Sequence, residues 1–485
     1  MTIETELRAF KTKLQVNEKD YPRQFSYLMR VAKACKRVRN WYVETALKKM
    51  KEDGITVFSS KEELLKYSPR ELRKELTKLI NSDPEWAWLK GIPSTPRTYI
   101  FEQIEKTFVG GKGKKYNFVF QCKCMAKDIK ERLEKLKEKA KKEGRELTEE
   151  EIKKATVFFN NKKPYEPDNL YKVKGFPRFI QDIRHISFPI DGVTIDGKNK
   201  CVVLPTSSGN KKFNVPKMES VKIFYHDHDL NPEGIDKSAI FTFSYDGQDW
   251  WMSVKQIVEV AKIPAGKESE VLGIDLGLKT TAYLSNGQKI KNITEDKSIK
   301  EWEKRKKYLD ALRKKNLEKS PIEKIKTPRG KMVKPKSAKY KKLTKHIQIL
   351  DNKITRYKDT LVKQQVASID LSNVKGIVFE DFKIESMKHN KKWSGKVQNS
   401  CIGITRRAII NKAKVLGIPI MKAPKSFPST QVCSNCGERN LHMRKNLKER
   451  TFKCEFCGHT LNRDLNASIN LAKKWGSPDL VPYDK

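Results

Sequence analysis

Two Cys-x-x-Cys pairs near the end of the chain constrain its fold more than any other feature. Cys433 and Cys436 form the first pair, and Cys454 and Cys457 form the second, with seventeen residues between the pairs. Each pair places two thiols on one side of a tight turn, and a glycine follows each pair as a turn residue. This spacing is typical of a zinc ribbon, in which four thiolates close a structural metal site. Four unrelated reduced cysteines and an iron–sulfur cluster are the alternatives.

The remaining cysteines and the absence of targeting signals indicate a cytoplasmic protein. Five further cysteines are scattered along the chain, which favours reduced thiols over a disulfide framework. The first residues lack the basic and apolar stretches of a secretory signal. The longest apolar runs are far shorter than the roughly 18–20 residues that a membrane span needs.

The charge of the chain points to a polyanionic partner. Lys and Arg number 102 against 59 Asp and Glu among 485 residues, a formal net charge of +43 at pH 7. So many positive side chains repel one another in a compact protein, and such an excess usually persists because a polyanion neutralises it. Nucleic acid is the first candidate partner and an anionic membrane surface the second. A Lys-rich thermophile surface predicts matching acidic residues, which this chain lacks.

The first half of the chain is predicted to contain a helical block between strands. Residues 5–16 alternate between apolar and polar positions and predict a strand. The pattern is helical from residue 21 to about 160, and short β-like runs follow between 175 and 260. Asp246-Gly247 is a hairpin turn signal. We expect a small barrel, completed by the N-terminal strand. Capping boxes are predicted at Ser60…Glu63, Ser68…Glu71 and Thr148…Glu151.

Residues 300–358 form a strongly basic segment, with 22 Lys and Arg against 6 Asp and Glu. Apolar residues recur at helical spacing on both sides of a central break, which predicts two helices joined by a basic loop. A solvated helical face is the ordinary interpretation of a charge run. The excess of one sign favours contacts with phosphates instead.

Three acidic residues lie in or next to predicted apolar strands or at a predicted helix start. Asp275 lies inside the apolar strand predicted at 270–277, and Glu380 ends a second apolar strand. Asp464 opens a predicted helix after Asn462-Arg463. A carboxylate in an apolar strand is costly to bury unless it is paired or bound to metal. Taken singly, Asp275 or Glu380 could equally be a salt-bridge partner or a strand-end cap.

The order of these motifs resembles that of a known nuclease family. Gly273-Ile274-Asp275-Leu276-Gly277 comes first, then a strand ending in Glu380-Asp381-Phe382, then the four cysteines, then the segment 463–470. This order is similar to the RuvC half of transposon-encoded TnpB proteins and miniature type V CRISPR effectors. The resemblance is specific over residues 266–474 and weaker before them. The chain length tilts the comparison toward a CRISPR effector over a transposon protein.

The resemblance implies a catalytic role for the three acidic residues. Asp275, Glu380 and Asp464 would be the RuvC carboxylates and would hold two Mg²⁺ ions, which stabilise the attacking and leaving oxygens of a phosphodiester. The family often has Asp or His where this chain has Asn462, so Asp464 is the sole aspartate of its motif.

The resemblance also implies the partners and the domain plan of the chain. A guide RNA would select a double-stranded target DNA, and the protein would be either a monomer or a homodimer that associates with the nucleoid when bound to target. Candidate nucleic-acid contacts are Arg406, Arg407, Lys341 and Lys342. The expected fold is multidomain α+β, with four parts. The first half would contain a wedge-type oligonucleotide-binding β-barrel (1–20 and 171–265) and a helical recognition domain (21–170). The second half would contain a RuvC-like nuclease of RNase H type (266–430 and 460–485, with the basic helical insert 300–358) and a zinc ribbon (431–459).

Two other functions stay open from the sequence. The first is a RuvC-type nuclease or transposase that works without a guide, against which the large Lys-rich half argues. The second is a guided or unguided DNA-binding protein that has lost its nuclease activity, against which the three carboxylates argue.

Overall fold

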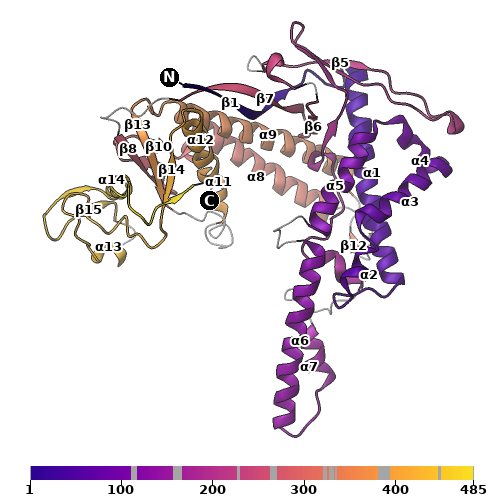
Figure 1. The fold of residues 1–485 in the computed structure, drawn as a ribbon, viewed down its shortest axis with the longest axis horizontal. Helices are drawn as coiled ribbons and strands as arrows, with labels where there is room; N and C mark the ends of the chain where they lie inside the picture. Colours follow the sequence, from indigo (N-terminus) through magenta and orange to yellow (C-terminus); the bar gives the residue numbers. More distant parts are fainter. Residues whose placement is uncertain are drawn as a thin grey trace. The chain divides into compact units, whose positions relative to one another are not determined.

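A computed structural model describes residues 2–110, 117–156, 167–226, 230–236, 238–262, 270–319, 325–326, 332–333, 336–380, 394–445 and 449–483. The chain forms two compact units (Figure 1). The N-terminal unit is Leu7–Ile257, and the C-terminal unit combines Met1–Glu6 with Val258–Lys485. Among the described helices, none is both long and apolar enough to cross a bilayer.

The C-terminal unit is built on a mixed six-stranded sheet with strand order β10-β9-β8-β13-β14-β17. β8, β13 and β14 are parallel, and the remaining pairs are antiparallel. Parallel neighbours need crossover connections, which helices supply here. The strands are β8 (Glu270–Leu276), β9 (Thr280–Leu284), β10 (Lys289–Lys291), β13 (Val374–Glu380), β14 (Ile420–Ala423) and β17 (Val481–Pro482).

Helices cover both faces of this sheet. Ile377 and Phe379 of β13 pack in one core with side chains of α9 and α12. Val378, which points to the opposite face, packs with Leu471 of α14. The helices of this unit are α8 (Lys297–Glu318), α9 (Ala338–Ala367), α11 (Ser394–Asn399), α12 (Ile402–Val415), α13 (His442–Lys445) and α14 (Arg463–Lys473).

The basic segment forms the two predicted helices, α8 and α9. Trp302 packs edge-on against Tyr357, with ring centroids 5.2 Å apart. Lys358 donates to Glu303 at 2.8 Å. These contacts join the start of α8 to the second half of α9, so the helices are antiparallel. Of the loop between them the structure describes only Lys319, β11 (Ile325–Lys326), β12 (Met332–Val333) and residues 336–337. The central break expected from the sequence, at Thr327-Pro328-Arg329-Gly330 and Lys334-Pro335, lies outside the described residues.

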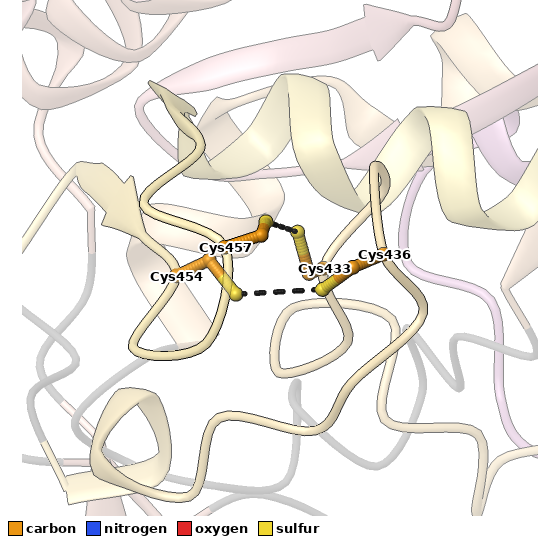
Figure 2. Close-up of side chains that lie close together, drawn as sticks. All are labelled: Cys433, Cys436, Cys454 and Cys457. Atoms are coloured by element: carbon orange, nitrogen blue, oxygen red, sulfur yellow. Dashed lines mark hydrogen bonds between the residues drawn. The ribbon is translucent and has the colours of Figure 1, made fainter.

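The four cysteines of the two Cys-x-x-Cys pairs come together in a small lobe of the C-terminal unit. Figure 2 shows the two pairs facing one another across two tight turns. The lobe contains the antiparallel strands β15 (Thr451–Lys453) and β16 (Thr460–Asn462). Gly437 and Gly458 have φ angles of +80° and +73°, which glycine adopts without strain. The turn role expected for these glycines is confirmed.

The N-terminal unit contains two sheets, β1-β7-β6-β2 and β3-β4-β5. Leu14 donates its backbone N–H to Trp250, and Gln15 donates to Phe224, so one segment bonds to both sheets. The closed barrel expected from the sequence stays a prediction. The strands are β1 (Thr2–Lys13), β2 (Ser187–Ile190), β3 (Thr194–Asp196), β4 (Cys201–Leu204), β5 (Val221–Phe224), β6 (Phe241–Tyr245) and β7 (Trp250–Lys262).

The predicted hairpin turn at Asp246-Gly247 is present between β6 and β7. Tyr245 pairs with Trp250 across it, and Gly247 has a φ of +97°. Trp250 is fully buried and packs against Tyr245 and Phe188. Its ring therefore belongs to the core of the unit.

The helical block of the N-terminal unit packs around the long helix α1, whose buried face includes Leu28, Val31, Cys35 and Tyr42. The helices are α1 (Pro22–Glu52), α2 (Lys61–Leu65), α3 (Pro69–Ser82), α4 (Pro84–Ala87), α5 (Ser94–Phe108), α6 (Phe118–Lys142) and α7 (Glu149–Thr156). Short 3₁₀ turns of the chain are η1 (Trp88–Gly91), η2 (Pro167–Lys172), η3 (Ile183–His185), η4 (Lys211–Phe213), η5 (Pro232–Gly234) and η6 (Ile293–Glu295).

Two of the three predicted capping boxes form. Ser60 and Glu63 exchange both bonds at the start of α2. The box predicted at Ser68 and Glu71 is wrong, because the Glu71 N–H donates to the Ser68 carbonyl, and the Glu71 carboxylate pairs with Lys74. The Ser68 side chain therefore has no cap bond to make at the start of α3.

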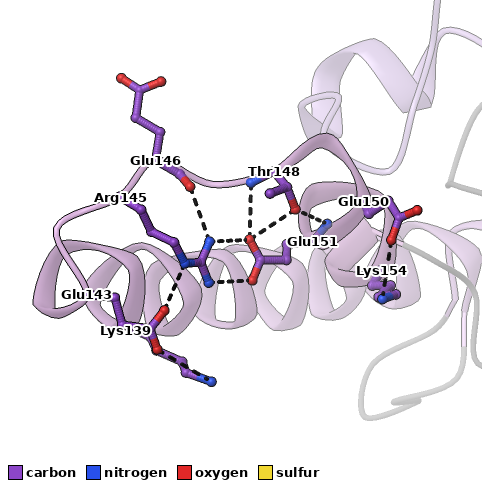
Figure 3. A network of polar contacts seen from close by, with 8 residues as sticks. All are labelled: Lys139, Glu143, Arg145, Glu146, Thr148, Glu150, Glu151 and Lys154. Carbon is purple, nitrogen blue, oxygen red and sulfur yellow. Dashed lines mark hydrogen bonds and ion pairs between the residues drawn. The ribbon is translucent and has the colours of Figure 1, made fainter.

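The third capping box belongs to the turn between α6 and α7, a helical hairpin that extends from the other helices of its unit (Figure 1). Thr148 and Glu151 exchange the box bonds, and Arg145 binds Glu151 through two bonds of 2.8 Å (Figure 3). The bond from Arg145 leads the contacts that lower the pKa of Glu151 to about 2. This charge network fixes the turn of the hairpin.

The four-part domain plan stays a prediction. The boundary between the two compact units lies between Ile257 and Val258, a few residues before the expected end of the barrel at 265.

Candidate functional site

Two of the three predicted carboxylates lie at the carboxyl ends of neighbouring parallel strands: Glu380 is the last residue of β13, and Asp275 is the last but one of β8. Ile274 of β8 pairs with Phe379 of β13, so Asp275 and Glu380 follow at the same edge of the sheet. Side chains alternate along a strand, so Asp275 points to the same face as Gly273, and Glu380 to the same face as Val378. That face is the one that α14 covers.

The third carboxylate reaches this edge on α14. Asn462 is the N-cap of the helix, and its side-chain oxygen accepts from the N–H groups of Asp464 and Leu465 at 3.0 and 3.2 Å. Asp464 therefore lies in the first helical turn, where the helix dipole favours a negative charge. The asparagine at 462 has a structural role that the sequence motif did not reveal.

Gly273 lets α14 lie directly on β8. A Cβ at this position would stand 1.9 Å from the Ser468 carbonyl oxygen and 2.4 Å from the Ala472 nitrogen. Both are backbone atoms and cannot rotate away. Only glycine permits this approach, which holds the helix bearing Asp464 against the strand bearing Asp275.

The three acidic groups act on one another electrostatically. Burial is the main cause that raises the pKa of Asp275 to about 8, and the negative charges of Glu380 and Asp464 raise it further. Arg463 and Arg450 oppose this shift. Asp275 is buried, with 8% of its surface exposed. A divalent cation is the kind of ligand that would favour the ionised form of such a group.

Arg450 is a site residue that the sequence did not indicate. Its Nη1 lies 3.2 Å from Oδ1 and 3.3 Å from Oδ2 of Asp464. Its carbonyl accepts from the Arg463 N–H at 2.8 Å, which fixes its backbone beside the start of α14. Arg450 stands among other charged residues in the sequence, and nothing in the pattern separates it from them.

The four cysteines have the geometry of a closed metal site. Their sulfur atoms all lie within 4.8 Å of one another. Cys433 and Cys457 are 3.7 Å apart, and Cys436 and Cys454 are 3.6 Å apart (Figure 2). Although burial opposes the thiolate, backbone N–H groups of Cys457 and Phe456 help to lower the pKa of Cys454 to about 6. Four soft, ionisable sulfur ligands fit zinc.

The carboxylates and the cysteines differ in how tightly they converge. Within the described residues, the four cysteines form the one group of three or more Cys, His, Asp or Glu side chains arranged to hold a single metal ion. Asp275, Glu380 and Asp464 do not form such a tight group. A site that shares two ions about 3.5–4 Å apart spreads its carboxylates more widely than a single-ion cage does.

The four residues predicted to contact nucleic acid lie on α9 and α12. Arg406 and Arg407 are on α12, and the Arg406 guanidinium lies 5.8 Å from the Tyr483 ring centroid. Lys341 and Lys342 are exposed near the start of α9, and Arg407 is exposed as well. Their role in binding nucleic acid stays a prediction.

Comparison with known proteins confirms the resemblance that the motifs indicated, to miniature type V effectors and TnpB-like proteins. Residues 403–471 match the family model of the Cas12f1-like TNB domain. This segment contains most of α12, all four cysteines and most of α14. A curated protein of Streptomyces pristinaespiralis, named "Putative RNA-guided DNA endonuclease", is 25% identical over 240 residues. The match covers 50% of this chain and 53% of that protein, so the chain spans about half the length of this relative.

Two solved structures are similar over nearly the whole chain. The Cas12f1–sgRNA–target DNA complex gives a TM-score of 0.41 at 16% identity, covering 98% of this chain and 100% of that one. The mini-RNA-guided endonuclease CRISPR-Cas_phi3 gives 0.39 at 10% identity, covering 96% and 92%.

The contact at Gly273 gives a first prediction. Gly273→Ala forces α14 away from β8, and we expect it to lower the free energy of unfolding by about 1–3 kcal/mol, as overpacked cores do. Gly395→Ala is the matched control, because a Cβ there meets nothing within 4 Å. Denaturant unfolding followed by circular dichroism measures both. Equal stabilities for the two variants would show that the helix does not rest on Gly273.

The raised pKa of Asp275 gives a second prediction. Below pH 8 a proton competes with a divalent cation for this carboxylate, so we expect Mn²⁺ affinity to rise by about tenfold per pH unit from pH 6 and to level off above 8. Without a cation, the pH dependence of stability runs the other way. The contribution of Asp275 to the free energy of unfolding is complete below its unfolded pKa of about 3.9 and is lost as the pH rises towards 8. Electron paramagnetic resonance of free Mn²⁺ measures the affinity. Asp275→Asn should bind Mn²⁺ weakly and with little dependence on pH, and an unchanged pH profile in this variant would contradict the assignment.

Proposed function

We propose that this protein is an RNA-guided DNA endonuclease that cleaves target DNA at a single RuvC-type site by Mg²⁺-dependent hydrolysis. The observation that carries this proposal is the shared edge of β8, β13 and α14, where Asp275, Glu380 and Asp464 influence one another. An acidic edge of this kind suits metal-assisted phosphodiester hydrolysis.

The donor set of this edge fits Mg²⁺, a hard cation that prefers oxygen ligands. Asp275, Glu380 and Asp464 would hold the ions. When bound, a pair of Mg²⁺ ions supplies the positive charge that stabilises the attacking and leaving oxygens of the scissile phosphate. Because its pKa lies near 8, Asp275 would give up a proton when it binds a cation at neutral pH.

Arg450 and Gly273 prepare this edge for catalysis. Arg450 pairs with Asp464 through two contacts and so holds the carboxylate in place at the helix start. Gly273 fixes the distance between the backbone of α14 and that of β8. Electrostatic preorganisation of this kind contributes much of the rate enhancement of enzymes.

The guide RNA is proposed from two independent features. The curated relative that matches half of this chain is named as RNA-guided. The net charge of +43 suits a protein that carries a structured RNA and grips an RNA–DNA duplex through its phosphates. On this proposal the N-terminal unit supplies the wedge barrel and the recognition helices, and Arg406, Arg407, Lys341 and Lys342 contact nucleic acid.

The four-thiolate site is proposed to hold a structural zinc ion. Four protein ligands leave no open position for substrate, so its role is to fold the ribbon. Catalysis and folding are thus assigned to two different metals at two different sets of side chains.

Removal of single carboxylates tests the nuclease. Asp275→Asn, Glu380→Gln and Asp464→Asn should each lower guided cleavage in Mg²⁺ by at least about a thousandfold, several kcal/mol of transition-state stabilisation, and should keep RNA and DNA binding. Asp370→Asn is the control, because Asp370 is an exposed acid of the same unit that caps Ser372. Parental cleavage by Asp275→Asn or Glu380→Gln would end the RuvC assignment.

Co-purified RNA tests the guide and separates the rival functions. We expect RNA of defined length and a constant scaffold sequence, and cleavage only of DNA complementary to its variable part, assayed on a library of flanking motifs. Cleavage independent of the bound RNA would favour a guide-free RuvC nuclease or transposase. Guided binding that gives no cleavage in Mg²⁺ would favour a binding protein.

A further inference from the structure

Three side chains of α14 bind backbone groups of the segment that carries Cys433. The Asn466 oxygen accepts from the Ser434 N–H at 2.8 Å, and its amide nitrogen donates to the Val432 carbonyl at 2.7 Å. Asn470 donates to the same Val432 carbonyl at 2.7 Å and to that of Ser429 at 2.8 Å. The Lys473 ammonium donates to the Ser434 carbonyl. We call Asn466, Asn470 and Lys473 the ribbon clamp.

The partners of the clamp are backbone groups on both sides of a metal ligand. Val432 and Ser434 flank Cys433, so their peptide groups move with the turn that presents this sulfur. Asn466 is fully buried, Asn470 is 3% exposed and Cys433 is 1% exposed. Water does not replace these bonds while the lobe is folded, so each amide depends on the turn for its partners.

A further buried asparagine links the two cysteine pairs. Asn440 is fully buried, its oxygen accepts from the Glu455 N–H at 2.8 Å, and its nitrogen lies 3.5 Å from the Cys454 sulfur. The Asn440 N–H also donates to the Gln431 carbonyl at 2.7 Å. The second pair is therefore connected through Asn440 to Gln431, in the same segment that the clamp binds.

The clamp and the sheet hold opposite sides of α14. Positions 466, 470 and 473 follow at intervals of four and three residues and share one face. Ser468 and Ala472, whose backbones meet Gly273, lie on roughly the opposite face at 100° per residue. The helix that carries Asp464 is thus held between β8 and the cysteine turn, and a displacement of either changes the position of Asp464.

We propose that Asn466 and Asn470 are positioning residues that make the catalytic centre dependent on the four-thiolate site. When the thiolates hold their metal, the turn around Cys433 is rigid and the clamp sets the start of α14. When the metal leaves, this turn loses its fixed shape, the clamp loses its partners, and Asp464 no longer meets Asp275 and Glu380. Occupancy of the ribbon thereby controls divalent-cation binding at the nuclease. The inference rests on the proposed function for its catalytic consequence, and on the hydrogen bonds alone for its structural part.

The first test separates positioning from folding. The double variant Asn466→Ala/Asn470→Ala should keep its zinc, measured by mass spectrometry of the metal content, and should keep guided DNA binding. Its Mn²⁺ affinity should fall at least tenfold, with a matching loss of kcat that high Mn²⁺ restores. Asn286→Ala is the control, because Asn286 is an exposed turn residue of the same unit. Its zinc content, Mn²⁺ affinity and kcat should equal those of the parental protein. Parental Mn²⁺ affinity in a double variant that keeps its zinc would overturn the proposal.

The second test uses the parental protein, so it does not depend on the folding of a variant. Zinc is removed with a zinc-selective chelator, and amide hydrogen exchange is compared before and after. We expect protection to fall in 463–473 and to persist in β13 and α12, and unchanged protection in 463–473 would overturn the clamp. This readout needs no nuclease activity. If the parental protein never cleaves DNA but loses protection in α14, the proposed function is wrong and the clamp stands. If it cleaves DNA but α14 keeps its protection after zinc removal, the clamp is wrong and the proposed function stands.

Discussion

Three carboxylates gathered at one partly buried edge are the constraint on which the rest of this structure depends. Asp275, the most buried of them, holds its proton up to about pH 8, because burial and the charges of Glu380 and Asp464 both disfavour its ionised form. Once Asp275 is ionised, repulsion among the three carboxylates opposes the packing of β8, β13 and α14 at this edge. The unit opposes this repulsion with apolar cores on both faces of the sheet, with Arg450 beside Asp464 and with the backbone contact at Gly273.

This arrangement explains why a small cysteine lobe is placed immediately before the last acidic helix. A helix of only eleven residues has little stability of its own. The amide groups of Asn466 and Asn470 attach it to the turn around Cys433, and Arg450 reaches Asp464 from the residue before β15. The lobe therefore contributes to the site both a fixed support and a positive charge.

Much of the site could be predicted from the sequence because its signals are local. Two apolar strands, each with a carboxylate, place Asp275 and Glu380, and the spacing of the cysteines predicts their cluster. The same holds for the hairpin at Asp246-Gly247 and for the capping box at Ser60. The box at Ser68 failed because a main-chain carbonyl competed for the same N–H, and a four-residue pattern does not record that competition.

The rest depended on contacts between distant segments. Gly273 is part of a recognisable motif, but its closeness to Ser468 and Ala472 follows only from the packing of α14 on β8. Arg450 and the asparagines of α14 have no distinctive spacing relative to their partners. Their roles arise from tertiary structure, which sequence periodicity does not encode.

On the proposed function, Asp275, Glu380 and Asp464 share divalent cations. A crystal structure of the protein with Mn²⁺, recorded at the manganese and zinc absorption edges, tests it most directly. We expect two manganese peaks about 4 Å apart, bounded by these three side chains, and a single zinc peak among the four cysteines. A difference map with no manganese at the carboxylates, or with manganese bound only elsewhere, would contradict it.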